Sequence, residues 1–167
     1  MRQIVSELKE TDPQRRMAAI RGLQSRNVDE AFPILLACLY DDDAGVRYES
    51  AKMMGVVGDD RAVKPLMLAL RDPDGRVRRE SAFSLGFLGG QEAVSALVQT
   101  LDDPDDAVRK EAIRSLIQIA SPEAIPALSR LVAGEEDDIR LLAAYGLGRI
   151  SGSHCPPVRN NKLRKAG

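Results

Sequence analysis

The apolar and polar positions of this chain repeat with a period of 31 residues. A β-branched residue followed by arginine returns at this step, in the pairs Val46-Arg47, Val77-Arg78, Val108-Arg109 and Ile139-Arg140. After each pair, apolar residues stand three or four positions apart, as Ala82, Leu85 and Leu88 do, which is typical of an amphipathic helix. A second apolar block follows at the same step, marked by Leu35, Leu66, Leu97 and Leu128. The pattern predicts two helices in each unit.

Turn-forming residues separate the predicted helices. Glycine-rich stretches at residues 55–58 and 86–90 follow the first helix of two units, and we expect them to form the turn into the second helix. The second helix is expected over residues 61–71 and 91–101 of these units. It ends at segments rich in Asp and Pro, which stop one helix and can cap the next.

The units follow one another without insertions. The repeat divides the chain into a half-unit at 1–10, units at 12–41, 43–72, 74–103 and 105–134, a half-unit at 136–151 and a basic tail at 152–167. We therefore expect residues 1–151 to form an all-α, right-handed solenoid of stacked antiparallel helix pairs with about ten helices, and the tail to be disordered. Each half-unit leaves an apolar face open, which a longer array, another subunit or the tail could cover.

An acid stands four residues before the repeated arginine in every unit. The pairs are Asp12 and Arg16, Asp43 and Arg47, Asp74 and Arg78, Asp105 and Arg109, and Glu136 and Arg140. Residues four apart are neighbours on a helix, so this spacing predicts ion pairs within each first helix. A row of arginines could instead bind anions, but a carboxylate for every guanidinium favours a structural role.

The unit resembles the short HEAT-like repeat first associated with phycobilisome lyases. The residues that carry the resemblance in one unit are Asp43, Arg47, Ala51, Met54, Gly55, Gly58, Asp59, Ala62, Val63, Leu66, Ala69 and Leu70. The resemblance covers residues 1–151 and implies stacked helix pairs, arginine bonds between adjacent units, and second helices that line the concave side. It does not imply one function, because the family includes chromophore lyase subunits as well as adaptors.

Composition and charge exclude several classes of partner. The 24 basic and 25 acidic residues nearly cancel, so no overall field would draw the chain to nucleic acid or an anionic membrane. No apolar run is long enough to span a bilayer or resembles a secretory signal, which predicts a soluble, cytoplasmic protein. The two cysteines, Cys38 and Cys155, do not suggest a disulfide framework.

No group of residues in the sequence predicts catalysis, a cofactor or a metal site. The related deoxyhypusine hydroxylases bind iron through His-Glu pairs, whereas this chain has one histidine, His154. Beside it, Cys155 has no acid that would orient the histidine as a base. The acidic loops lack the EF-hand spacing, since Glu80 comes ninth and not twelfth after Asp72 begins the count. We therefore expect no enzymatic activity.

Exposed positions on the second helices are the candidate partner-binding site. The repeat fixes the scaffold and leaves these positions free to vary, and the candidates are Tyr40, Lys64, Leu68, Arg71, Ser95, Gln99 and Arg130. An aromatic, an aliphatic and two cations near the centre suit a protein-binding surface. The predicted function is a protein-interaction scaffold with a protein partner. The alternatives are a bilin lyase subunit or chaperone, suggested only by the resemblance, a less favoured nucleic-acid binder, and self-association through the end helices.

Overall fold

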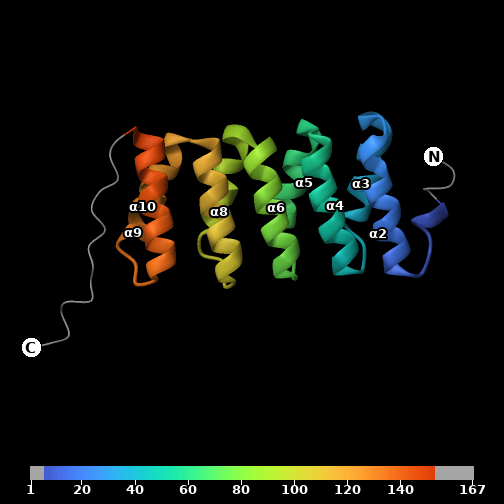
Figure 1. Ribbon diagram of the computed structural model, residues 1–167, viewed down its shortest axis with the longest axis horizontal. Helices are drawn as coiled ribbons and strands as arrows, with labels where there is room; N and C mark the ends of the chain where they lie inside the picture. The colour runs from blue at the N-terminus through green and yellow to red at the C-terminus, as the bar shows by residue number, and fades with distance from the viewer. Residues whose placement is uncertain (1–5, 153–167) are drawn as a thin grey trace, which may run out of the picture.

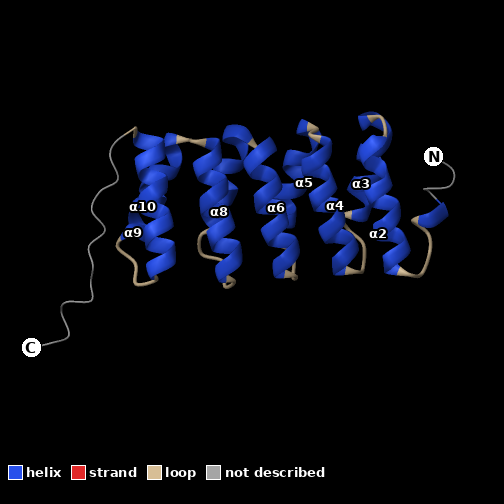
Figure 2. Ribbon diagram, viewed as in Figure 1, coloured by secondary structure: helices blue, strands red, loops and turns tan. Residues whose placement is uncertain are grey.

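The computed structural model of this chain describes residues 6–152. Within that range the chain consists of helices joined by turns, without strands, as Figure 2 shows. The helices stack side by side along one axis in the order of the sequence (Figure 1). The predicted all-α solenoid is therefore confirmed, while the expectations for residues 1–5 and for the tail from residue 153 onward lie outside the described residues.

Each unit contributes a first and a second helix, and the first helix is the longer one in the units that begin with α4, α6 and α8. The first helices are α2 (Pro13–Arg21), α4 (Ala44–Val57), α6 (Gly75–Leu88), α8 (Asp106–Ile119) and α10 (Asp137–Ser151). The second helices are α3 (Val28–Cys38), α5 (Val63–Ala69), α7 (Val94–Thr100) and α9 (Ile125–Val132). Short 3₁₀ turns join them at Gly22–Ser25, Asp60–Ala62, Gly90–Ala93 and Pro122–Ala124. The second helices are shorter than predicted because their first turn winds as 3₁₀ helix in three units.

Aspartates begin the first helices, as the sequence predicts. Asp12, Asp43, Asp74 and Asp105 are the N-cap residues of α2, α4, α6 and α8, and each has extended backbone angles. The Asp43 carboxylate accepts a hydrogen bond from the Val46 amide at 3.1 Å. The cap satisfies a backbone donor that has no partner within the helix.

Two glycines that were expected in turns lie inside helices. Gly55 and Gly86 belong to α4 and α6, where the next first helix crosses closely. A Cβ atom on Gly55 would lie 2.5 Å from the Ser84 Oγ, so only glycine permits this approach. The turns themselves use Gly58 and Gly90, whose φ angles of 76° and 45° are in the region that favours glycine.

The two rows of helices pack with different closeness. Successive first helices approach each other closely, whereas successive second helices lie further apart. Glycine and serine line the first-row contacts, and helix spacing follows the size of the side chains between helices. The expectation that the second helices line the concave side stays a prediction.

Aliphatic residues between the two rows form the core. Leu35, Leu66, Leu97 and Leu128 from the second helices and Leu23, Met54, Leu85 and Leu116 from the first row are completely or almost completely buried. They belong to one continuous cluster that runs through the stack. Each unit therefore buries its apolar residues against its neighbours, as the repeat predicts.

Candidate interaction surface

The repeated arginines bind the loops between units. The Arg47 Nε donates to Asp72 Oδ2 at 2.7 Å and its Nη2 donates to Asp72 Oδ1 at 2.9 Å. Its Nη1 donates to the carbonyl oxygens of Asp41 at 2.8 Å and Asp42 at 3.0 Å. Arg47 therefore ties the loop before its helix to the loop after the same hairpin. Arg16 and Arg78 repeat this arrangement with the carboxylates of Asp41 and Asp103.

The predicted ion pairs within the first helices are wrong. The four aspartates, such as Asp43 before Arg47, cap their helices instead, because the N-terminal amides compete for the carboxylate, whereas Glu136 makes no capping hydrogen bond. Arg47 instead forms a bidentate salt bridge with Asp72, which lies 25 residues later in the sequence. In the last units, Arg109 bonds Glu136 and Arg140 bonds Asp137.

The arginine ladder has little capacity left for an anion. The side chains of Arg47 and Asp72 are only 13% and 8% exposed. The hydrogen bond with Asp72 is the main reason that the pKa of Arg47 is raised. Because the protein itself occupies these guanidinium donors, the arrangement supports a structural role for the ladder.

The candidate residues on the second helices lie on the surface. Tyr40 and Leu68 are 64% and 62% exposed, which is unusual for large apolar side chains. The Arg71 side chain makes no hydrogen bond or ion pair with any described residue, whereas Lys64 lies 3.9 Å from the Glu92 carboxylate. Arg130 bonds Asp102 at 2.8 Å, and both Ser95 and Gln99 are exposed.

Two clefts divide these candidates. A cleft of about 390 Å³ between α3 and α5 is lined by Tyr40, Leu68 and Arg71 among others. A second cleft of about 390 Å³ between α5 and α7 is lined by Leu68, Arg71, Ser95 and Gln99 with their neighbours. Leu68 and Arg71 therefore face both clefts. Lys64 and Arg130 line neither of them.

An aromatic cleft on the first-helix row was not among the sequence candidates. It lies between α4 and α6, has a volume of about 250 Å³, and is lined by Lys52, Gly55, Val56, Glu80, Phe83, Ser84 and Phe87. The rings of Phe83 and Phe87 meet edge to face with centroids 5.0 Å apart, although they are 46% and 61% exposed. A sequence signal existed, because Phe83 stands where the other units carry Arg21, Lys52, Arg114 and Tyr145.

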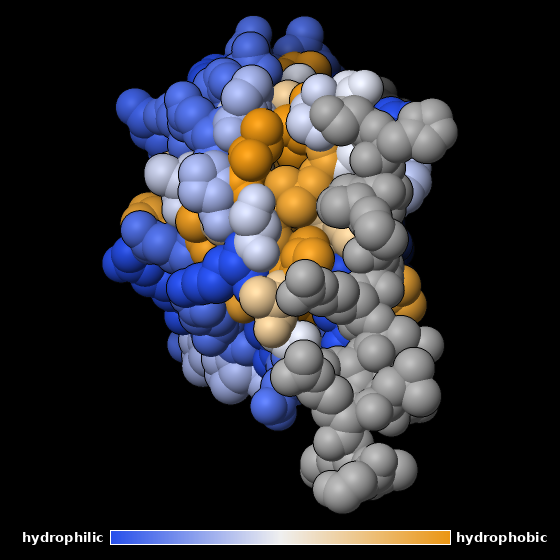
Figure 3. All heavy atoms as spheres, turned by 90° about the vertical axis from the view of Figure 1, so that its left-hand side faces the viewer, coloured by the Kyte–Doolittle hydropathy of each residue, from blue (hydrophilic) through white to orange (hydrophobic). Residues whose placement is uncertain are grey.

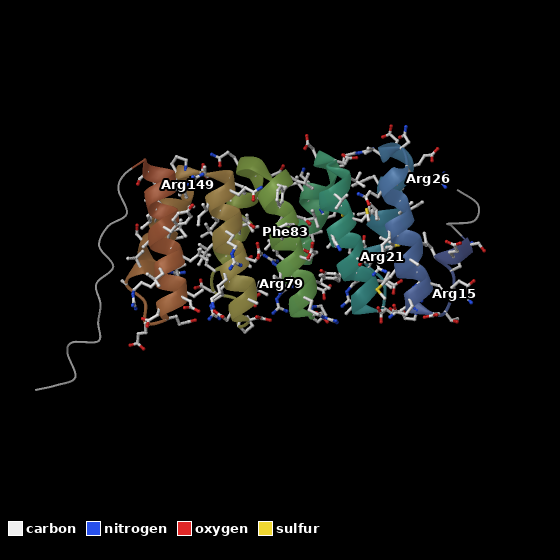
Figure 4. The ribbon with its side chains drawn as sticks, viewed as in Figure 1. Arg15, Arg21, Arg26, Arg79, Phe83 and Arg149 are labelled. Atoms are coloured by element: carbon white, nitrogen blue, oxygen red, sulfur yellow. The ribbon has the colours of Figure 1, made fainter. Side chains whose placement is uncertain are left out.

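One cation and one acid line the aromatic cleft. The Lys52 side chain makes no hydrogen bond or ion pair with described residues, whereas Arg79, which lies on α6 with Phe83 (Figure 4), lines a different cleft beside Tyr48 and Glu49. Burial raises the pKa of the Glu80 carboxyl, against a hydrogen bond from the Tyr48 hydroxyl and the charge of Lys52. The cleft thus combines an apolar floor with a rim that carries Lys52 and Glu80.

Groups with catalytic potential are poorly placed for chemistry. Burial raises the pKa of the Cys38 thiol to about 11, so it is protonated at neutral pH. Between residues 6 and 152, no cluster of three or more His, Cys, Asp or Glu side chains is placed to hold a metal ion. Cys155 and His154 lie outside the described residues. In the same described range, no helix has the length and apolar character needed to cross a membrane.

Comparisons with solved structures find the same fold. One chain in the complex of CpcE and CpcF of phycocyanin lyase from Nostoc sp. PCC7120 is 23% identical, with a TM-score of 0.77 over 90% of this chain and 64% of that chain. A designed armadillo repeat protein in complex with the peptide (KR)4 is 21% identical, with a TM-score of 0.68 over 91% of this chain and 82% of that one. An engineered protein is 26% identical, with a TM-score of 0.64 over 89% and 78%.

These likenesses concern the fold, and this chain spans just under two thirds of the lyase chain that it matches. A search of curated protein sequences found no significant match. The profile of HEAT repeats matches residues 1–74 and 63–148, which together include nearly every helix described above. The stacked hairpins, the capping aspartates and the buried arginine ladder agree with this match, and the chain belongs to the HEAT repeat family.

Proposed function

We propose that this chain is a non-enzymatic scaffold that binds a partner protein through the aromatic cleft of its first-helix row. The observation that carries the proposal is the exposed Phe83 and Phe87 pair beside Val56. Exposed aromatic residues that are clustered, and not scattered singly, mark interaction surfaces on soluble proteins.

The chemistry of the cleft indicates the kind of partner. Its apolar floor suits a large aliphatic or aromatic side chain, and rigid rings lose little entropy when they are covered. Lys52, which lines the cleft and makes no ion pair with described residues, suits an acidic residue beside that anchor. We therefore propose an acidic segment with a central apolar residue as the bound element.

A selection from a random peptide library tests this proposal. Enriched peptides should contain an apolar residue flanked by Asp or Glu. Replacing both Phe83 and Phe87 by alanine should weaken their binding by about 30-fold or more, since truncating an aromatic hot spot costs about 2 kcal/mol. Titration calorimetry or fluorescence anisotropy with an enriched peptide would measure the change. Enriched peptides that bind the double variant as tightly as the original chain would refute the assignment.

The second-helix surface around Leu68 and Arg71 is the other candidate site, since both residues face two clefts. The double variant L68A and R71A is the matched comparison, because it also removes one apolar and one long side chain from exposed positions. Loss of peptide binding in this variant alone would move the site to the second helices. Variants at Tyr40, Ser95 and Gln99 would then define its extent.

A role as a bilin lyase subunit or bilin-protein chaperone is a separate proposal. Its support is the likeness to a chain of the phycocyanin lyase complex, and at 23% identity that likeness concerns the fold. Mixing the chain with a bilin and recording the visible absorption spectrum tests it. An unchanged spectrum across the titration would exclude bilin binding by this chain.

A further inference from the structure

Residues at the C-terminal end of the stack are more exposed than their equivalents elsewhere. Leu147 is only half-buried, whereas its equivalents Leu85 and Leu116 are completely buried. Val132 is likewise half-buried, and its equivalent Leu101 is 1% exposed. Figure 3 looks onto this end and shows an apolar patch there. Among the described residues, α10 packs against α8 and α9 on one side, and no second helix follows α10.

A buried donor at this end lacks a partner. The Arg140 side chain is only 10% exposed, and its Nε forms no hydrogen bond within the described part of the chain. In Arg16, Arg47 and Arg78 the same atom donates to the aspartate at the end of the following second helix. The Nη atoms of Arg140 donate hydrogen bonds to the Gly134 carbonyl and to the Asp137 carboxylate. The side chain is therefore held in place, while its Nε has no acceptor among the described residues. An unsatisfied buried donor is costly, which makes this atom a specific site for an acceptor.

The N-terminal half-unit carries the matching acceptor. Glu10 stands 31 residues before Asp41, the aspartate that binds Arg16, and Leu8 stands 31 before Leu39. The Glu10 side chain is 40% exposed, and its one ion pair is a 3.5 Å contact with Arg15. Leu8 is half-buried, whereas Leu39 is 4% exposed. The N-terminal end thus presents the Glu10 carboxylate and the half-buried Leu8 at the positions that Asp41 and Leu39 occupy in the next unit. These are the positions of the residues that a second helix following α10 would supply.

We propose that identical chains associate head to tail, with the N-terminal half-unit of one copy completing the C-terminal half-unit of another. The Glu10 carboxylate of one copy accepts hydrogen bonds from Arg140 of the other, and Leu8 packs beside Leu147. Residues 153–167 contain no Asp or Glu, so their side chains offer no carboxylate to Arg140. Charge complementarity therefore favours a second copy over that segment as the occupant.

A head-to-tail contact joins two different surfaces, so each bound copy leaves one end open for the next. Mass should therefore grow beyond the dimer as the concentration of protein rises. Sedimentation velocity of the full chain over about a hundredfold range of concentration measures this growth. A single monomer peak at every concentration would overturn the proposal.

Charge reversal at either end identifies the contact. Glu10→Arg and Arg140→Glu should each raise the concentration needed for association by about tenfold or more, because like charges then face each other. A mixture of the two single variants should associate again, since it restores one junction between Arg140 and Glu10. A variant that had merely lost its fold would not recover on mixing. Helicity measured by circular dichroism provides a second check on each variant.

Arg149→Glu is the matched control. Arg149 lies on α10, makes no hydrogen bond or ion pair with described residues, and projects on the first-helix row (Figure 4). This variant should associate like the original chain. Association that resists Glu10→Arg but is lost in Arg140→Glu would indicate a contact between two C-terminal ends, and would overturn the head-to-tail register.

Discussion

At the scale of single residues, the chain can be stabilised where a first helix ends in an unfavourable backbone conformation. Ala120 follows α8 with a φ of 56°, a region that side chains with a Cβ adopt at a cost. Its equivalent two units earlier is Gly58, which has a φ of 76°. Ala120→Gly should therefore raise the free energy of unfolding by about 1 kcal/mol. Urea denaturation followed by circular dichroism measures this change.

An alanine-to-glycine change within a helix is the control, because it shows the effect of glycine where no backbone strain is relieved. Ala107 lies in the first turn of α8 with ordinary helical geometry. Ala107→Gly should lower the free energy of unfolding by about 0.5 to 1 kcal/mol, because glycine loses more backbone entropy in a helix. Two changes of the same sign would show that the strain at Ala120 is not relieved by glycine.

Capping of α6 by the Asp74 carboxylate should make the stability of the chain depend on pH. Hydrogen bonds from the Arg76 side chain are the first cause that lowers the pKa of Asp74, from 3.8 to about 2 in the folded chain. A lowered folded pKa means that the contribution is present above about pH 4 and is lost as the pH falls toward 2. Because Arg76 is well exposed, we expect about 1 kcal/mol.

Asp74→Asn tests this contribution, because the amide can still cap α6 but carries no charge. The original chain should be the more stable at pH 7, and the difference between the two proteins should shrink below about pH 4 and disappear as the pH falls through about 2. Thermal melts at several pH values measure both. A difference that stays constant across this range would assign the effect to geometry alone.

At the scale of helices, the sequence predicted where the helices lie better than it predicted which side chains contact one another. The 31-residue period placed every helix that the structure describes, because burial of one face imposes that spacing. The partner of Arg47 was not predictable from spacing within the helix, since acids stand both at Asp43 and at Asp72. Gly55 was misplaced for a related reason, as its role depends on Ser84 in the next unit.

Two adjacent arginines on α6 allow a matched test of the ladder. Arg78 bonds Asp103 through Nε and Nη2 with both side chains buried, whereas its neighbour Arg79 is exposed and has no described partner. Arg78→Ala should lower the free energy of unfolding by about 3 kcal/mol, because the Asp103 carboxylate would keep its charge without an ion-pair partner. Arg79→Ala should change it by less than about 0.5 kcal/mol. Equal effects in chemical denaturation would contradict the structural role of the ladder.

At the scale of the whole molecule, the stack has no single centre, and this limits what the sequence reveals about binding. The exposure of Leu68 and Arg71 was predictable, since it follows from the helical period. The aromatic cleft was not predictable, because the helical period indicates which residues are exposed but not which exposed residues of neighbouring units meet. The edge contact of Phe83 and Phe87 and the open side of Val56 depend on how α4 and α6 cross.

Because the units stack without a common centre, equivalent residues should contribute unequally to stability, depending on whether their unit has neighbours on both sides. Leu85 in α6 is completely buried between neighbouring units, whereas Leu147 in α10 is half-buried. Leu85→Ala should lower the free energy of local opening by about 3 kcal/mol through the cavity that it leaves, and Leu147→Ala by about half of that or less. Hydrogen exchange measures opening for each helix separately, which matters because a stack need not unfold in one step.

The protein concentration must be held where sedimentation shows only monomer, since a second copy on α10 would protect Leu147. Under that condition, exchange in the original chain should be slowest in α6 and α8 and faster in α2 and α10, which have neighbours on one side only among the described first helices. Raising the concentration should then slow exchange in α10 selectively if chains associate end to end. Uniform exchange along the chain, with equal losses from the two leucine variants, would mean that the molecule behaves as one cooperative core.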